Sequence, residues 1–374
     1  MGVAEAARRF GFKSRSSYYL FAALIREQGF AGVLDLRPSN AGVRRTQTPT
    51  PRKAGQIPTY PDRLRPEESL WACPADPWRN AFYGLQKAHH GLFVQIVRAV
   101  VEGNGVRGIS RIFDVDANTV LHYLQRAARQ CRRVTDRFLQ GLHVDELQLD
   151  EMWSFVCKKQ KRLTPQEEAH ALKGDQWCWL AFDARSRVIV QYEIGKRTYR
   201  LARDLLRHFR ERTDGTAPRL VTSDEYAGYE EALLAVYGSP GGAGASALAA
   251  QMDYAVVSKT REKGRVVAIE VKVIFGLEER VRQTLEESPV SKHVNTAFVE
   301  RSHLSRRQFN RRLARKTLGF SKKLENHLWQ YELETTMHNF VRPHRGLKNR
   351  TPMMAAGKTD HPWSVEELMA FCVP

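Results

Sequence analysis

Hydrophobic residues in the second half of the chain are arranged as short strands with one intervening helix. The stretches 144–156, 177–183 and 188–194 are apolar runs of strand length. Apolar residues then recur at helical spacing within 199–212, and 219–224 is a short buried strand. This order predicts an α/β domain with a mixed central sheet flanked by helices.

The chain beyond this fourth strand is expected to complete the domain around an insertion. A helix at 225–237 and a Gly/Ala-rich run precede a fifth strand at 254–258. The stretch 261–277 has an ambiguous pattern and is interpreted as an inserted hairpin. The resulting prediction is that residues 141–347 form the α/β domain, with an insertion around 238–292, and that residues 348–374 form a C-terminal tail.

All-helical modules are predicted ahead of this domain. Residues 1–37 have the pattern of a helix-turn-helix that is truncated at its start, although a helical surface hairpin is an alternative. Residues 38–79 are rich in Pro, Arg and Thr and are predicted to be a basic linker. Residues 80–140 contain a second and better-defined helix-turn-helix.

The second helix-turn-helix has a specific candidate for base contact. Its turn is expected at 114–116, and Val120 is the apolar residue that would hold the third helix on the second. If the third helix enters a major groove, its first turn would face the bases. The candidate contacts are Asn118, Thr119, His122 and Arg126. Trihelical units also serve as protein-docking modules, so that alternative stays open.

Charge and cysteine usage narrow the class of partner. The 374 residues carry a net charge of +18, which favours a polyanion such as double-stranded DNA. No apolar run approaches the roughly 18 residues of a membrane span, and no signal sequence is evident. The five cysteines are scattered without a CxxC pair, so a zinc site or a disulfide framework is not expected. We expect a cytoplasmic, nucleoid-associated protein with no membrane partner.

Three carboxylates stand in contexts that suit one metal site. Asp150 falls within the apolar strand LQLDEMWSFV, Asp224 ends the strand RLVTSD, and Glu300 opens a basic helix. Successive side chains of a strand point to opposite faces, so Asp145 and Glu151, at odd spacing from Asp150, should point away from it. Glu225 is interpreted as a solvated or helix-starting acid. The histidines are interpreted as packing residues or phosphate contacts, and His303 is also a candidate to support the metal ligands. Oxygen-only ligands favour Mg²⁺, for which Mn²⁺ could substitute.

The helix that follows Ala297 is the most DNA-like element of the sequence. Nine Lys or Arg residues and no acid occur between positions 301 and 323. At 100° per residue, Phe298, Phe309 and Leu313 share one face that could pack on the sheet, while Glu300 lies on the opposite side. The candidate DNA contacts are Arg301, Arg307, Arg311, Arg312, Arg315 and Lys316.

Four segments together resemble the DDE transposases of the insertion-sequence-one type. They are LDEMWSFV, GKRT, TSDEYAGYE and NTAFVERSHLSRRQFNRRLARKTLGFSK, in order within roughly residues 90–345. The resemblance implies an RNase H-like core in which Asp150, Asp224 and Glu300 bind divalent metal. It also implies a homodimer or larger assembly on DNA. The chain departs from the family in its 76-residue Asp224-to-Glu300 gap (300 − 224), its extra N-terminal helix-turn-helix and its lack of a cysteine pair.

The function expected from these observations is DNA transposition. Two Mg²⁺ ions about 3.5–4 Å apart would activate water to nick DNA at an element end and then align the 3′-OH for attack on target DNA. Two alternatives remain at this stage. One is a different RNase H-like nuclease or integrase, and the other is a catalytically decayed DNA-binding regulator.

Overall fold

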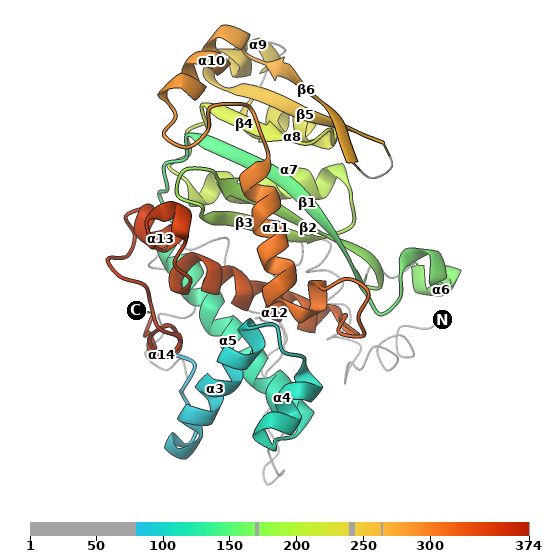
Figure 1. Cartoon of the computed structure of the whole chain (residues 1–374), viewed down its shortest axis with the longest axis vertical. Coiled ribbons are helices and arrows are strands. Elements are labelled where there is room, and N and C mark those ends of the chain that lie inside the picture. The colour runs from blue at the N-terminus through green and yellow to red at the C-terminus, as the bar shows by residue number, and fades with distance from the viewer. Residues whose placement is uncertain (1–79, 169–171, 239–243, 263–264, 374) are drawn as a thin grey trace, which may run out of the picture.

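The computed structural model describes residues 80–168, 172–238, 244–262 and 265–373 (Figure 1). The helix-turn-helix predicted at 1–37 and the linker predicted at 38–79 lie outside these residues. Within them, the chain forms one mixed sheet with helices on both faces and a group of helices beside it. The predicted α/β class is correct for this part of the chain.

The six strands of the sheet include all of those predicted. They are β1 (Glu146–Val156), β2 (Gly174–Asp183), β3 (Ile189–Gly195), β4 (Leu220–Ser223), β5 (Asp253–Glu262) and β6 (Arg265–Phe275). Their spatial order is β3-β2-β1-β4-β5-β6. β1 is antiparallel to β2 and parallel to β4, and β4 is parallel to β5. The first and fourth strands are therefore neighbours, and the arrangement is compatible with an RNase H-like core.

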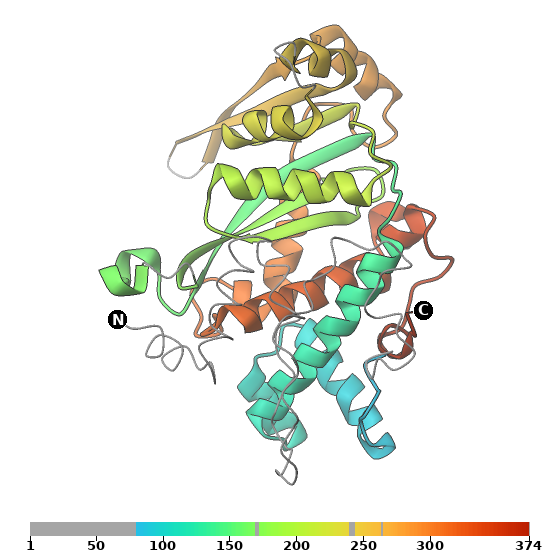
Figure 2. The same ribbon diagram turned by 180° about the vertical axis from the view of Figure 1, so that it is seen from behind.

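Hydrophobic side chains on both faces of β1 explain its central position. Leu147 and Leu149 point to one face and Met152 to the other, and all three are buried. α7 (Tyr199–Arg212) and α8 (Gly228–Tyr237) cover one face of the sheet. α11 (Ala297–Phe309) crosses the other face (Figures 1 and 2). The sheet thus separates α7 from α11.

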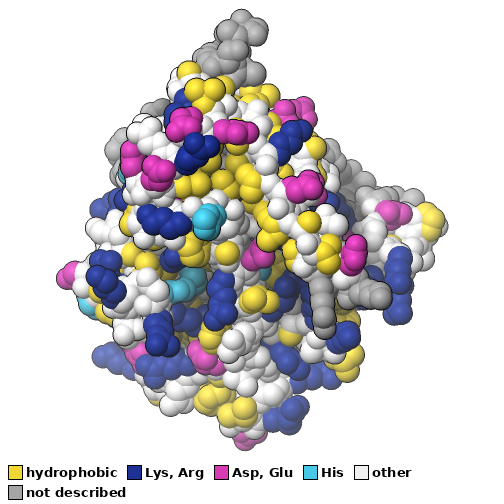
Figure 3. All heavy atoms as spheres, turned by 45° about the horizontal axis from the view of Figure 1, so that its top comes forward, with side chains coloured by type: hydrophobic (Ala, Val, Ile, Leu, Met, Phe, Trp, Pro, Cys, Tyr) yellow, Lys and Arg dark blue, Asp and Glu magenta, His cyan; other side chains and the backbone are white. Residues whose placement is uncertain are grey.

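The predicted insertion forms one edge of the sheet. It contains α9 (Gly244–Gln251), the β5–β6 hairpin and α10 (Glu278–Glu287). β5 is longer than predicted, and the segment of ambiguous pattern becomes the antiparallel strand β6. Val267, Ile269 and Val271 of β6 are exposed at this edge. Hydrophobic side chains gather across the upper half of the face seen in Figure 3, whereas Lys and Arg dominate its lower half.

Three helices occupy the segment predicted as the second helix-turn-helix. They are α3 (His90–Val101), α4 (Val106–Phe113) and α5 (Ala117–Phe138), preceded by the short 3-10 helix η2 (Lys87–His89). Asp114 makes the turn in the left-handed region, with φ of 50°, and the Asp116 side chain caps α5 by accepting from the amide of Asn118 at 2.7 Å. Val120 is fully buried, as its predicted packing role requires.

The helical layer shares its hydrophobic core with the sheet domain. α5 packs along α12 (Leu324–Thr336), and buried residues of both belong to one continuous cluster with β1 and β2. The boundary predicted near 140 therefore does not separate two independent cores.

The remaining short elements are η3 (Gln160–Arg162), α6 (Pro165–Glu168), η4 (Arg311–Leu313), the π-helical η5 (Met337–Val341), η6 (Arg345–Leu347), α13 (Pro352–Ala355) and α14 (Val365–Ala370).

The C-terminal segment is packed, which differs from the expected tail at 348–374. Trp363, Leu368 and Met369 are buried against α3 and α5. The Gln130 side-chain amide on α5 donates to the carbonyls of Leu368 at 3.1 Å and Phe371 at 2.7 Å. The elements here are only four and six residues long, too short for a periodic pattern to be visible in the sequence. No helix in the described part of the chain has the length and hydrophobicity needed to cross a membrane.

Candidate metal centre

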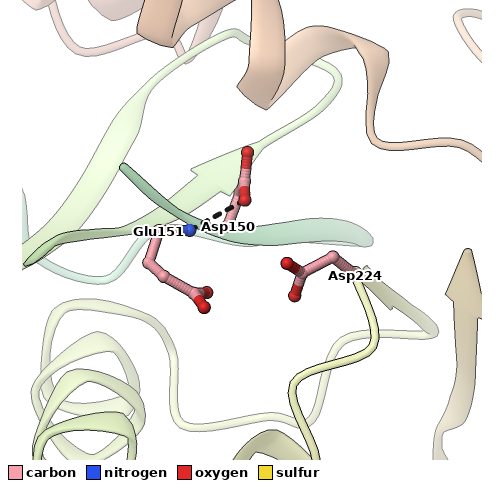
Figure 4. A group of neighbouring side chains, drawn as sticks. All are labelled: Asp150, Glu151 and Asp224. Carbon is pink, nitrogen blue, oxygen red and sulfur yellow. Dashed lines mark hydrogen bonds between the residues drawn. The ribbon is translucent and has the colours of Figure 1, made fainter. Parts of the chain in front are cut away.

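Asp150 and Asp224 are brought together by the pairing of β1 with β4. The parallel register places Leu149 opposite Ser223, so the next residue on each strand path is an aspartate. Asp150, Glu151 and Asp224 each offer a carboxylate oxygen, and these oxygens lie within 4.8 Å of one another (Figure 4). The predicted approach of Asp150 and Asp224 is thus present in the structure.

Glu151 joins this group although its side chain leaves the strand on the other side from Asp150 (Figure 4). Arg197 Nε donates to its carboxylate at 2.7 Å, and the Tyr229 hydroxyl donates at 2.9 Å. Burial, followed by the charge of Asp224, raises the pKa of Glu151 to about 7, and the contacts with Arg197 and Tyr229 oppose the shift. The alternation of side chains along the strand therefore predicted correctly that Glu151 points away from Asp150. The carboxylate still lies close to the site because Asp224 sits at the end of the neighbouring strand.

Asp224 lies close to the two other carboxylates, and its pKa is raised as well. Burial and the charge of Asp150 raise its pKa, while the backbone amide of Tyr226, 3.3 Å from Oδ1, opposes the shift. Asp150 accepts a hydrogen bond from the backbone amide of Glu151 at 2.8 Å. Partly buried carboxylates this close to one another are stabilised by a proton or by a cation. The donor set consists of carboxylate oxygens alone, which fits Mg²⁺ or Mn²⁺.

α11 is fixed across β1 by hydrogen bonds from a buried glutamine. The Gln148 side chain donates to the Asn295 carbonyl at 2.8 Å and accepts from the Val299 amide at 3.0 Å. This anchor sets the first turn of α11 beside the centre of the sheet. One turn further along, His303 Nε2 lies 3.3 Å from Oδ2 of Asp150. The expectation that His303 stands next to a predicted ligand agrees with this geometry.

Glu300, the third predicted ligand, lies outside the group of three carboxylates. Its Oε1 accepts from the Thr296 hydroxyl at 2.6 Å and forms an ion pair with Lys259 of β5. Its side chain is 44% exposed, so it is not locked into the core. Glu300 occurs three residues before His303, and side chains at this spacing lie on the same side of a helix. Its role as a metal ligand remains a prediction.

The basic helix is shorter than predicted, and it packs through a partly different face. α11 ends at Phe309, and the Asn310 side chain caps the following turn by accepting from Arg312 N at 3.0 Å. The buried residues of α11 are Val299, Ser302, His303 and Arg306. The predicted packing face is present only in part: Phe298 packs against the hydrophobic core and Leu313 within it, but Leu313 lies in the turn that follows α11. Its angles assumed a helix that continues beyond Phe309.

The predicted DNA contacts near α11 fall into two groups. Arg301, Arg311, Arg315 and Lys316 are exposed. Arg307 is half-buried, and burial and then Arg315 lower its pKa, whereas Asp150 raises it. Arg312 instead serves the fold, because its Nε donates to Gln330 at 2.6 Å and burial lowers its pKa to about 10. Arg312 is consequently placed unfavourably for a DNA contact.

The predicted contacts on α5 are also divided. Asn118 is exposed, Thr119 and His122 are half-buried, and all three lie in the first two turns of the helix. Arg126 is buried and donates to the backbone carbonyls of Ala81 at 3.0 Å and Tyr83 at 2.5 Å. Arg126 thus holds the start of the described chain on α5, and it is not available to a phosphate in this arrangement.

Two residues at the site were not singled out as site residues by the sequence. Lys259 holds Glu300, and no motif marks it. Arg197 holds Glu151 and was noted only as part of the segment GKRT. A lysine on an inserted strand has no local signal for such a role. Only the pairing of β4 with β5 places Lys259 within reach of α11.

Comparisons with known proteins add little to this geometry. No protein-family model and no curated protein matches the chain. Among solved structures, one match is the crystal structure of a pre-cleavage Mos1 transpososome. The match has 11% sequence identity and a TM-score of 0.15, and it covers 65% of this chain and 77% of that chain. Superposition this poor carries no argument, so the site is interpreted from its own residues.

Proposed function

We propose that this protein is a metal-dependent DNA transposase that cuts DNA strands and joins the resulting 3′-OH to target DNA. The observation that carries the proposal is the convergence of Asp150 and Asp224 on neighbouring parallel strands, directly beside α11. Acidic oxygens next to a strongly basic surface suit a reaction on a phosphodiester, because the acids bind metal and the cations bind the backbone.

In this proposal, Asp150, Asp224 and Glu300 hold divalent metal, Mg²⁺ or Mn²⁺. When bound, the metal supplies an activated nucleophile and neutralises charge on the reacting phosphate. Burial lowers the pKa of Arg307 and the charge of Asp150 opposes that shift, so the two groups are neighbours, and Arg307 would hold a phosphate next to the acids. His303, against Asp150, orients that carboxylate. Lys259 keeps Glu300 in place through its ion pair.

DNA recognition is assigned to exposed positions outside the acidic group. Asn118, Thr119 and His122 on α5 would read bases at an element end. Arg301, Arg311, Arg315 and Lys316 would contact the phosphate backbone of the bound double-stranded DNA. The protein would act as a homodimer or larger assembly on paired ends, associated with the nucleoid in the cytoplasm.

A nicking and joining assay tests the proposal. Supercoiled plasmid is incubated with the protein in Mg²⁺, in Mn²⁺ and in EDTA, and the products are separated by electrophoresis. We expect metal-dependent nicking by the wild type and its loss in Asp150→Ala, Asp224→Ala and Glu300→Ala. Glu225→Ala is the matched control, because Glu225 is an exposed neighbour of Asp224. Equal activity in all five proteins would refute the site assignment. Nicking with no joined product would identify a hydrolytic nuclease instead.

A further inference from the structure

α7 lies on the opposite face of the sheet from α11 (Figure 2), and a row of arginines covers its exposed side. The exposed residues between Arg200 and Glu211 are Arg200, Arg203, Arg207, Arg210 and Glu211. Four of the five are arginine and none is lysine. The exposed face of a helix normally carries both acids and bases at i, i+4 spacing. The excess of arginine on α7 is therefore unusual for a surface that contacts only water.

The ion pairs within this row are too few and too long to account for it. Arg200, Arg203 and Arg207 share one carboxylate, that of Asp204, at 3.7, 3.9 and 3.9 Å. Their side chains remain 50%, 47% and 49% exposed. Arg207 also lies 3.4 Å from Glu211 and 2.7 Å from His208 Nε2. Four guanidinium groups therefore face two carboxylates, and positive charge is left over.

The shape of the surface also suits an anionic partner. Arg210 donates to the Val236 carbonyl at 2.6 Å and lies over the Tyr237 ring, which holds it against α8. A hollow of about 440 Å³ opens between α7 and the end of α8. Its lining includes Arg203, Arg207, Arg210, Gly215 and Val236. Planar guanidinium groups around an open hollow match the bidentate recognition of phosphate oxygens.

We infer that the α7 arginine row, defined as Arg200, Arg203, Arg207 and Arg210, binds the phosphate backbone of a second DNA duplex. At 1.5 Å per residue the row extends about 15 Å, which equals about four base-pair steps of a duplex at 3.4 Å of rise each. The sheet separates this row from Asp150 and α11, and the row lies on the outer side of α7, so both surfaces can be occupied together. The inference rests on the proposed function, since strand joining requires the protein to hold two DNA segments.

The salt dependence of DNA binding tests the inference. The affinity for a 30-base-pair duplex is measured by fluorescence anisotropy between 50 and 200 mM NaCl. The test variant is Arg200→Gln/Arg203→Gln/Arg207→Gln. The control variant, Arg219→Gln/Arg282→Gln/Lys292→Gln, removes the same charge from exposed positions in and beside the insertion, where Arg219 pairs with Glu287 and Arg282 with Glu279. Thermal unfolding midpoints verify that both variants are folded.

Loss of three phosphate contacts should reduce the slope of log affinity against log salt by about 2.7, or 0.9 per contact. Over this salt range the wild type should lose about 40-fold more affinity than the test variant. The control should keep the wild-type slope. Equal slopes in all three proteins, or an equal decrease in both variants, would overturn the inference. So would an unchanged DNA slope with loss of binding to phosphatidylserine vesicles, which would identify a membrane surface.

Failure of the proposed function is recognisable separately. Asp150→Ala is measured beside the other proteins, both in nicking and in the salt titration. If Asp150→Ala nicks like the wild type, the metal centre is refuted, while the effect of the arginines on the salt slope still decides the second surface.

Discussion

Asp150 on β1 and Asp224 directly after β4 hold carboxylate oxygens within 4.8 Å of each other. Asp150 follows Leu149 and Asp224 follows Ser223, and these two preceding residues are partners in the parallel register of β1 and β4. The sheet itself therefore brings the two aspartates together. Burial and the charge of Asp150 together raise the pKa of Asp224. A raised pKa means that the ionised carboxylate opposes folding at neutral pH, and a bound cation would remove that opposition.

Metal should therefore stabilise the folded protein. At a concentration 100-fold above its dissociation constant, Mg²⁺ or Mn²⁺ should add about 2.7 kcal/mol, measured as an increase in the thermal unfolding midpoint that EDTA reverses. Asp224→Asn should abolish this increase and, without metal at pH 7, unfold at a higher temperature than the wild type. Glu225→Gln should behave like the wild type. A metal-dependent increase that survives in Asp224→Asn would place the cation elsewhere.

Glu300 and Glu151 compete for the position of third ligand, and their surroundings predict different phenotypes. Glu300→Gln should reduce nicking by roughly 100-fold or more, because it removes a proposed ligand of the metal that stabilises charge on the reacting phosphate, and should leave stability nearly unchanged. Glu151→Ala should instead cost about 1–3 kcal/mol in urea unfolding, because the Arg197 guanidinium and the buried Tyr229 hydroxyl lose their acceptor. If Glu151→Ala alone abolishes nicking while remaining folded, Glu151 completes the site.

Arg306 is predicted to be essential for the fold, unlike its neighbours on α11. It is fully buried, lies 3.1 Å from Glu334, donates to Thr335 at 2.6 Å and stacks on Tyr331. Arg306→Met should destabilise the protein by about 3–5 kcal/mol, since Glu334 would keep a poorly compensated buried charge. Arg301→Met, at an exposed position of the same helix, should change stability by less than about 0.5 kcal/mol. Similar losses in the two variants would contradict this assignment.

Acid should destabilise the protein partly through His327. Burial, followed by Arg312 and Arg306, lowers the pKa of His327 to about 3. Between this value and the ordinary pKa near 6.5, the unfolded chain takes up a proton that the folded protein refuses. Stability therefore falls as pH drops below about 6.5, by about 2.7 kcal/mol at pH 4.5.

A comparison of two histidine variants measures this contribution. Urea unfolding is followed between pH 4.5 and 7.5 for the wild type, His327→Gln and His293→Gln, the last at an exposed position. The stability of His327→Gln should depend less steeply on pH than that of the other two proteins. Parallel curves for all three would show that His327 is not the group responsible.

Local patterns predicted much of this architecture because strand and helix periods depend on short stretches of sequence. The four strands before Asp224 and the helix at 199–212 occur where their apolar spacing placed them. The cap at Asp116 and the buried Val120 were likewise visible locally. The end of α11 was missed, since it depends on Asn310 turning the chain where the basic composition continues. The packed C-terminal segment was missed because its elements are too short to show a period.

The candidate site also combines features that the local sequence predicts with features that depend on tertiary packing. The sequence by itself determined that Asp150 lies on the first strand and Asp224 at the end of the fourth, because apolar spacing and side-chain alternation are local properties of the chain. The tertiary structure pairs those two strands. Only the tertiary structure decided that Glu151 approaches them from the other face and that Glu300 pairs with Lys259. It also decided that Arg126 and Arg312 are committed to the fold while the α7 arginine row is left exposed. Such outcomes depend on which distant segments pack together, and burial by a remote segment changes the energy of a charge without leaving a mark in the local sequence.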